Sequence, residues 1–164
     1  KDVEWHFIGH LQTNKVKYMA SFVSLIHSVD SLKLLKEINK QALKAGRVID
    51  VLLQLHVAAE ETKFGLTQHE IVEMLESDDF IALKHVRVVG LMAMATNTED
   101  EEQVAMEFES VRQFYHVLKD GYFSGKPEFK EISMGMSGDY LIAQKYESTL
   151  VRVGSSIFGE RIYE

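Results

Sequence analysis

The residues with the clearest potential for chemistry lie between positions 131 and 159. A glycine- and serine-containing turn, residues 135–139, follows the short apolar run 132–134 and precedes the helix-like run 140–146. A strand, such a turn and a helix start in that order can bind phosphate, because free N–H groups and the helix dipole point at the ligand. This stretch is therefore a candidate anion site.

A second candidate follows directly, because residues 150–153 read as a strand that carries Arg152 and then opens into Gly154, Ser155 and Ser156. Two such loops could hold one phosphate between them, and Arg152 could reach the remainder of the ligand. The alternative is that both loops are ordinary turns between a strand and a helix, since glycine and serine are common in turns.

Composition narrows the class of protein. The 164 residues are 46% hydrophobic and 26% charged, which predicts one globular domain spanning residues 1–164. No apolar run approaches the roughly 20 residues of a membrane span, and no signal peptide is visible, so we expect no membrane partner. The absence of cysteine excludes disulfides and thiol nucleophiles and is consistent with a cytoplasmic location.

The charge balance also excludes a class of partner. Eighteen Lys and Arg residues stand against 25 Asp and Glu residues, for a net charge of -7. This balance argues against general binding of nucleic acid. The seven histidines form no paired ligand motif, so no metal site is predicted.

Strands and helices alternate along the chain. Helical periodicity follows the second strand as far as Gly46, and Thr67 with Glu70 forms a capping-box signature for a helix over residues 68–75. An acidic start at residues 98–102 opens a long helix that reaches about Lys119. The predicted strands are residues 3–9, 23–29, 48–57, 86–94, 132–134 and 150–153.

This rhythm predicts an α/β fold with a parallel sheet, and two architectures compete. One is an open doubly wound sheet, and the other is a TIM-type (β/α)₈ barrel, of which six of eight units are present. In both, the functional face lies at the carboxyl ends of the strands. The residues expected near that face are His10, Gln12, Asn14, His56, Lys63, Met94, Ser137 and Gly154.

Five sequence strings together resemble a known family. They are residues 5–15, 60–65, 90–94, 134–139 and 148–159, and they are similar to the pyridoxal-phosphate homeostasis protein family (YggS/PROSC-like) from end to end. The resemblance implies a single (β/α)₈ barrel like the N-terminal domain of alanine racemase. It also implies pyridoxal 5′-phosphate (PLP) as the cofactor, bound at the carboxyl end of the barrel.

The resemblance implies roles for particular residues. Ser137, Gly154 and Ser155 would hold the phosphate, Arg152 would face the pyridine nitrogen, and Met94 would lie against the cofactor ring. The family's lysine, which binds the aldehyde as a Schiff base from a Val-Ser-Lys-Thr-Lys-type first strand, does not occur in this sequence. Neither does the Gly-Glu-Asn motif of the second strand, so we expect both missing units to lie upstream of Lys1.

Two consequences follow from that expectation. Without the family's lysine, PLP should bind weakly and mostly non-covalently. Lys63 is the best remaining amine, although Glu60 and Glu61 should keep it protonated. The apolar edges at residues 5–9 and 150–154 should also make the chain poorly soluble or pair it with another copy.

The resulting hypothesis is a non-catalytic PLP carrier that serves PLP homeostasis, with PLP-dependent apoenzymes as the implied recipients. One alternative is a PLP-dependent, racemase-like enzyme, which needs a second acid or base that another domain normally brings. The other alternative is an α/β interaction module without a ligand.

Overall fold

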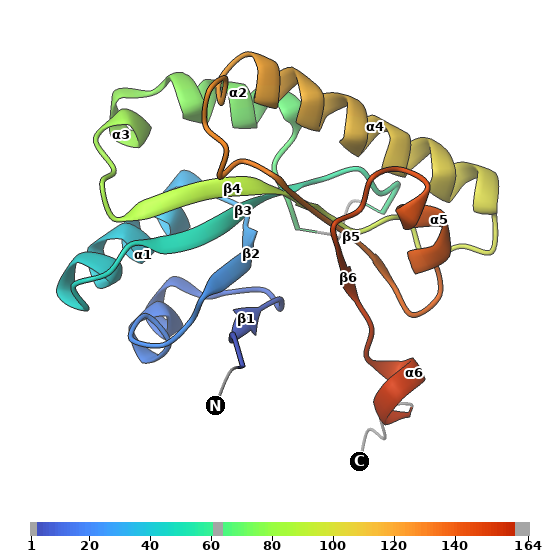
Figure 1. Cartoon of the computed structure of the whole chain (residues 1–164), viewed down its shortest axis with the longest axis horizontal. Helices are drawn as coiled ribbons and strands as arrows, with labels where there is room; N and C mark the ends of the chain where they lie inside the picture. Colours follow the sequence, from blue (N-terminus) through green and yellow to red (C-terminus); the bar gives the residue numbers. More distant parts are fainter. Residues whose placement is uncertain (1–2, 61–63, 160–164) are drawn as a thin grey trace.

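The computed structural model describes residues 3–60 and 64–159 and contains one sheet of six parallel strands. The spatial order of the strands equals their order in the chain (Figure 1). This order confirms the predicted partial barrel and rules out the doubly wound sheet, whose order reverses midway. The strands are β1 (His6–Phe7), β2 (Leu25–Val29), β3 (Ile49–Leu55), β4 (Val86–Ala93), β5 (Glu131–Met136) and β6 (Leu150–Arg152).

Helices cover the convex, outer face of the curled sheet, as the right-handed βαβ connection requires (Figure 1). The predicted capping box is confirmed, since the Thr67 hydroxyl accepts from Glu70 N–H and the Glu70 carboxylate accepts from Thr67 N–H. The helices are the 3₁₀ helix η1 (Thr13–Tyr18), α1 (Leu32–Lys44), α2 (Gln68–Glu76), α3 (Asp78–Ile81), α4 (Glu101–Asp120), α5 (Tyr140–Gln144) and α6 (Ser155–Phe158).

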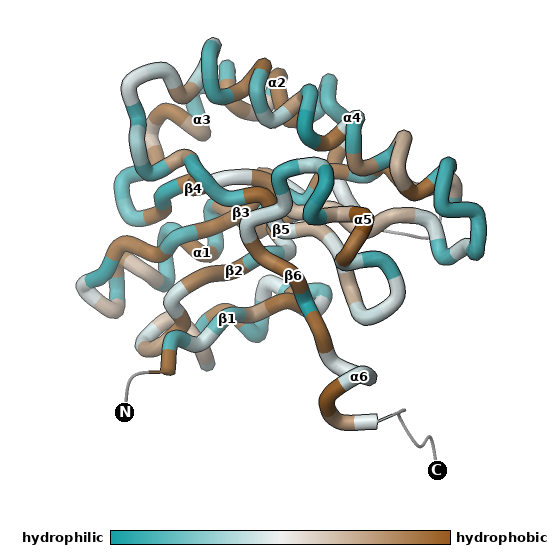
Figure 2. Tube along the Cα trace, turned by 45° about the vertical axis from the view of Figure 1, so that its right-hand side comes forward, coloured by the Kyte–Doolittle hydropathy of each residue, from teal (hydrophilic) through white to brown (hydrophobic). Residues whose placement is uncertain are grey.

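Each strand sends alternate side chains to the two faces, and both faces are apolar. Apolar residues accordingly make up much of the strands (Figure 2). Outward residues such as Leu53, Leu91 and Ile132 pack against the helices in the main core. Inward residues form a smaller cluster inside the curl, made of Leu25, Leu52, Val89 and Met92. The apolar sequence of β3 therefore reflects burial on both faces, as predicted.

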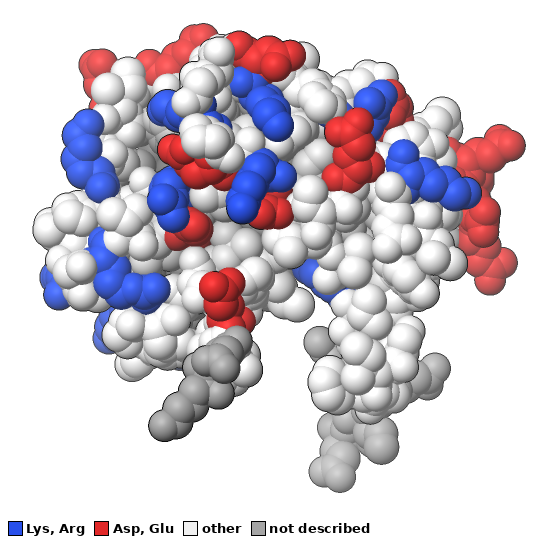
Figure 3. Space-filling view, viewed as in Figure 1, with Lys and Arg blue, Asp and Glu red and all other residues white. Residues whose placement is uncertain are grey.

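The first strand is shorter than predicted. Only two residues of β1 pair with β2, through His6 with Leu25 and Phe7 with Ile26, whereas residues 3–9 were expected to be extended. Its neighbours Trp5 and Ile8 are 61% and 50% exposed. Among the described strands, β1 and β6 are the two edges, and a hollow separates the chain ends that carry them (Figure 3).

Within the described part of the chain, no helix combines the length and hydropathy that crossing a bilayer requires.

Candidate functional site

A polar layer lies on the inner face of the sheet, next to the apolar cluster of Leu25, Leu52, Val89 and Met92. The layer contains His27 from β2 and Ser133 from β5, which are 2% and 0% exposed. The His27 Nδ1 atom lies 2.8 Å from Ser133 Oγ, although β2 and β5 are not neighbours in the sheet. This contact shows that the sheet curls far enough for opposite strands to meet inside it.

Arg152 projects from β6 into the same layer. Its Nη1 donates to the backbone oxygen and the hydroxyl of Ser133, both at 2.8 Å, and its Nη2 donates to the Ala93 carbonyl at 2.9 Å. The guanidinium therefore connects β4, β5 and β6. Burial lowers the pKa of Arg152 to about 10, while Asp139 opposes that shift, so the group stays charged at neutral pH.

Arg152 retains donors for a ligand. A guanidinium has five N–H bonds, and the three contacts above use both hydrogens of Nη1 and one of Nη2. Among the described residues, no hydrogen bond is recorded for the Nε hydrogen or the second Nη2 hydrogen. A ring nitrogen or another acceptor in the hollow of the half-barrel could accept from either group.

The two glycine- and serine-containing loops meet, as the phosphate hypothesis requires. Backbone N–H groups of Gly154 and Ser156 both donate to the Ser137 hydroxyl, at 3.3 and 3.4 Å. No atom lies within 4 Å of the position that a Cβ would occupy on Gly154 or on Gly138, so there is open space beside both loops. Donors that converge beside open space are a suitable cradle for an anion.

The structure changes two details of the sequence interpretation. Ser156, which was given no role in the sequence interpretation, donates its N–H group to Ser137 alongside Gly154, while the role of Ser155 stays a prediction. The predicted contribution of a helix dipole is small, because α5 has five residues and α6 has four. An anion at these loops would therefore be held mainly by hydrogen bonds from individual N–H groups and only slightly by a helix dipole.

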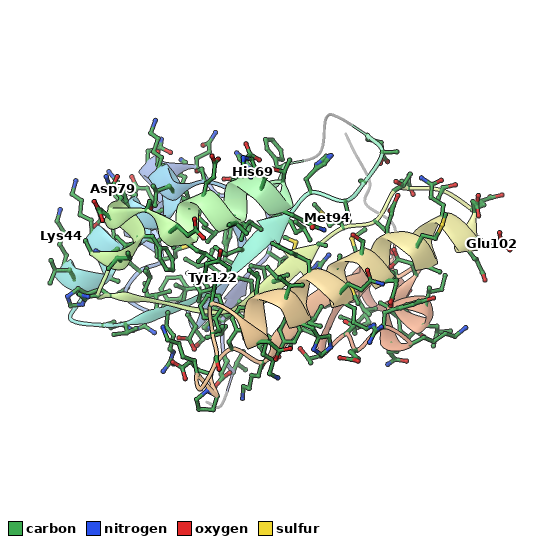
Figure 4. The ribbon with its side chains drawn as sticks, turned by 90° about the horizontal axis from the view of Figure 1, so that it is seen from above. Lys44, His69, Asp79, Met94, Glu102 and Tyr122 are labelled. Atoms are coloured by element: carbon green, nitrogen blue, oxygen red, sulfur yellow. The ribbon has the colours of Figure 1, made fainter. Side chains whose placement is uncertain are left out.

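Met94 lies just beyond the end of β4, beside the inner apolar cluster. Figure 4 places it toward the start of α4, where Glu102 is labelled, and away from Lys44 at the end of α1. A cavity of about 270 Å³ separates the loop after β4 from the loop after β5, and Met94, Met136, Gly138 and Asp139 contribute to its lining. Met94 is thus at the carboxyl end of the sheet, as predicted.

A larger cavity, about 510 Å³, lies at the opposite end of the strands, beside the end of α4. Its cations already have partners, since Arg87 donates to both Asp50 oxygens and Lys84 donates to the Ile81 carbonyl. The Lys126 ammonium lies 5.7 Å from the centre of the Phe123 ring. The cations that line this cavity therefore already contact neighbouring residues of the protein.

His10, Asn14 and Lys63 were also expected near the carboxyl ends of the strands. The His10 ring stacks on Phe64 at 3.9 Å and lies 3.3 Å from an Asp30 oxygen. Asn14 lies inside η1, which begins at Thr13. Lys63 lies outside the described residues.

The sequence interpretation did not identify His27 or Ser133. Both lie in strands that it predicted correctly, but they are 106 positions apart and belong to no recognisable motif. A polar residue in an otherwise apolar strand is the signal that could have identified each of them, because buried polar groups require partners.

Six parallel strands that follow one another in a curled sheet define a partial barrel. Accordingly, the family model described as "Alanine racemase, N-terminal domain" matches residues 2–162. The pyridoxal phosphate homeostasis protein of Aquifex aeolicus (strain VF5) is 43% identical over 162 residues, which cover 99% of this chain and 69% of that protein. The chain belongs to the pyridoxal phosphate homeostasis protein family.

Solved structures agree with this assignment. PipY of Synechococcus elongatus PCC7942 without PLP superposes with a TM-score of 0.86 at 30% identity, covering 96% of this chain and 72% of that one. The same protein with PLP bound gives 0.83 at 29% identity, covering 97% and 72%. The chain spans about two thirds of the length of the curated relatives it matches.

Proposed function

We propose that this protein binds PLP at the carboxyl end of its half-barrel and serves PLP homeostasis without catalysing a reaction on it. The observation that carries the proposal is the convergence of the Ser137 loop, the Gly154 loop and Arg152 on one side of the sheet. The relative that was solved with PLP bound has the same fold over 97% of this chain.

The residues present fit the chemistry of the cofactor. The phosphate would bind at the Ser137 hydroxyl and at the N–H groups of Gly154, Ser155 and Ser156. The present contacts to Ser137 are long, at 3.3 and 3.4 Å, and a phosphate dianion would form shorter, charge-assisted bonds with the same donors. Met94 would provide an apolar contact for the ring.

Arg152 accounts for the proposed absence of catalysis. Bound PLP supplies an aldehyde and a pyridine ring that can withdraw electrons, most strongly when its nitrogen is protonated. Arg152 has donors only and stays charged at neutral pH, so it favours a ring nitrogen without a proton. A neutral ring is the weaker electron sink, which is consistent with the proposed carrier.

Alanine substitutions test this arrangement by separating the two parts of the cofactor. We expect Arg152→Ala to weaken PLP binding about 10- to 100-fold, the loss typical of a hydrogen bond to a charged group, and to leave the affinity for inorganic phosphate unchanged. Ser137→Ala should weaken both ligands. Affinities can be measured by equilibrium dialysis with PLP and with phosphate.

Arg87→Ala is the matched control, because Arg87 is a paired arginine at the opposite end of β4. It should bind both ligands as the unsubstituted protein does. Equal PLP affinity in Arg152→Ala and Arg87→Ala would contradict the proposed site, and turnover of an amino acid by the PLP-loaded protein would contradict the non-catalytic function.

A further inference from the structure

A chain of hydrogen bonds crosses the inside of the half-barrel between the two edge strands. His6 Nδ1 on β1 lies 3.1 Å from His27 Nε2 on β2, and His27 Nδ1 lies 2.8 Å from Ser133 Oγ on β5. The Ser133 hydroxyl in turn accepts from Arg152 Nη1 on β6 at 2.8 Å. The four side chains come from strands that are far apart in the sequence, and only His6 is exposed.

The protons of this chain have one consistent arrangement. Arg152 can only donate, so the Ser133 oxygen is its acceptor. That oxygen could accept from His27 as well, but the hydroxyl hydrogen would then lack an acceptor, because His27 Nδ1 is the only other side-chain partner of Ser133 Oγ among the described residues. The arrangement that satisfies every hydrogen therefore directs the Ser133 hydroxyl hydrogen to His27 Nδ1. His27 must then be the neutral tautomer that carries its proton on Nε2, and it donates that proton to His6 Nδ1. Each group therefore donates to the next one: Arg152 to Ser133, Ser133 to His27, and His27 to His6.

The surroundings of His27 preserve this arrangement. Burial, and then the electrostatic effects of His6 and Arg152, lower the pKa of His27 to about 3. A protonated His27 would carry hydrogens on both ring nitrogens and could not accept from Ser133. His27 therefore remains an acceptor throughout the neutral range.

We propose that His27 is a positioning residue for Arg152, because it binds the Ser133 hydroxyl hydrogen and so keeps the Ser133 oxygen available to the guanidinium. Ser133 holds Nη1 at two points, through its hydroxyl and its backbone oxygen, and Ala93 accepts from Nη2. The Nε hydrogen and the second Nη2 hydrogen have no partner among the described residues and would serve the ligand. The inference rests on the proposed PLP function, since it assigns Arg152 to the cofactor's ring.

The orientation of the hydroxyl is what makes His27 necessary. A serine hydroxyl rotates freely, and in a buried site its hydrogen must find an acceptor. His27 Nδ1 is the only such acceptor recorded among the described residues. Without it, the hydroxyl hydrogen would turn toward other oxygens and compete with Arg152 for them, so the guanidinium would lose its single orientation.

The tautomer can be measured without any ligand. In protein labelled with ¹⁵N-histidine, long-range ¹H–¹⁵N correlation spectra should show His27 with a protonated Nε2 and an unprotonated Nδ1 at neutral pH. A proton on Nδ1 of His27 would overturn the inference. This measurement decides the direction of the hydrogen bonds whether or not PLP binds.

Two substitutions at the same position then test positioning. His27→Leu removes the acceptor, so we expect PLP affinity to fall about tenfold while the affinity for inorganic phosphate stays unchanged. His27→Asn is the matched variant, because its carbonyl oxygen is as close to Cβ as Nδ1 is and can accept from Ser133. It should restore most of the PLP affinity.

Equal PLP affinity in folded His27→Leu and the unsubstituted protein would overturn the inference. If His27→Leu does not fold, Ser133→Ala carries the same test, because a methyl group cannot accept from Arg152 Nη1. An unsubstituted protein that shows the expected tautomer and binds phosphate, but not PLP, would contradict the proposed function and leave the hydrogen-bond chain itself established.

Discussion

Replacing Gly90 with alanine should leave little folded protein. Gly90 has a φ of +158° in β4, and a Cβ built on it would lie 1.8 Å from the Glu131 carbonyl oxygen and 2.6 Å from the carbonyl carbon. Both are backbone atoms of the neighbouring strand β5, so they cannot move aside as a flexible side chain would. We expect a loss of more than about 4 kcal/mol in the free energy of unfolding, measured by urea denaturation.

The control for this substitution is Gly125→Ala. Gly125 also has a positive φ, +73°, but no atom lies within 4 Å of the position of its Cβ. Its cost should be only the roughly 1–2 kcal/mol of a left-handed conformation. Equal denaturation midpoints for the two variants would show that β4 and β5 can separate at Gly90 at little cost. They would refute the expectation that a Cβ at position 90 destabilises the fold by contact with the backbone of β5.

Gly90 matters for the site because of where it lies in β4. The register between β3 and β4 shifts there, since Val51 pairs with Val88 but Leu52 pairs with Gly90. The extra residue, Val89, is a β-bulge, which changes the direction of the side chains that follow. Inward-facing Met92 and Met94 both lie beyond this bulge, so Gly90 helps to set the wall of the proposed cofactor site.

The parallel direction of the strands could be predicted from the sequence because it depends on local patterns, whereas their order was predicted only with the help of the family resemblance. Alternation of apolar strands with amphipathic helices, such as α1, makes parallel pairing with a helix in each connection the simplest arrangement. The capping box at Thr67 is likewise a local feature, and its two hydrogen bonds appear as expected.

The bulge and the polar layer could not be predicted in the same way. A glycine in an apolar run gives no information on which backbone will approach it, and the partner of Gly90 is 41 positions away in β5. The partner of His27 depends on how far the whole sheet curls, which is a property of all the strands together. The length of β1 likewise depends on where β2 begins to pair with it.

The buried histidine of β2 should also make the protein sensitive to acid. Burial lowers the pKa of His27 to about 3 in the folded protein, whereas in the unfolded chain the imidazole has its ordinary pKa of 6.5. Between these values the unfolded chain binds a proton that the folded protein does not, so the free energy of unfolding falls as the pH falls. The loss for one group approaches about 1.4 kcal/mol per pH unit.

The range from pH 6.5 to 4.5 isolates this contribution. The carboxylates with lowered pKa values, Glu70, Glu109 and Glu147, are stabilising when ionised, and they lose that contribution only as the pH falls below their ordinary value of 4.5. Across the higher range, urea denaturation of the unsubstituted protein should show a loss of about 2 kcal/mol from His27 alone.

His27→Leu should remove this slope, because leucine binds no proton in either state. His69→Leu is the matched control, since His69 lies on the exposed start of α2 beside Glu73, and its slope should equal that of the unsubstituted protein. A slope in His27→Leu as steep as in the control would mean that another group takes up the proton on unfolding. In that case the burial of a neutral His27 between His6 and Ser133 would not be the cause of the acid sensitivity.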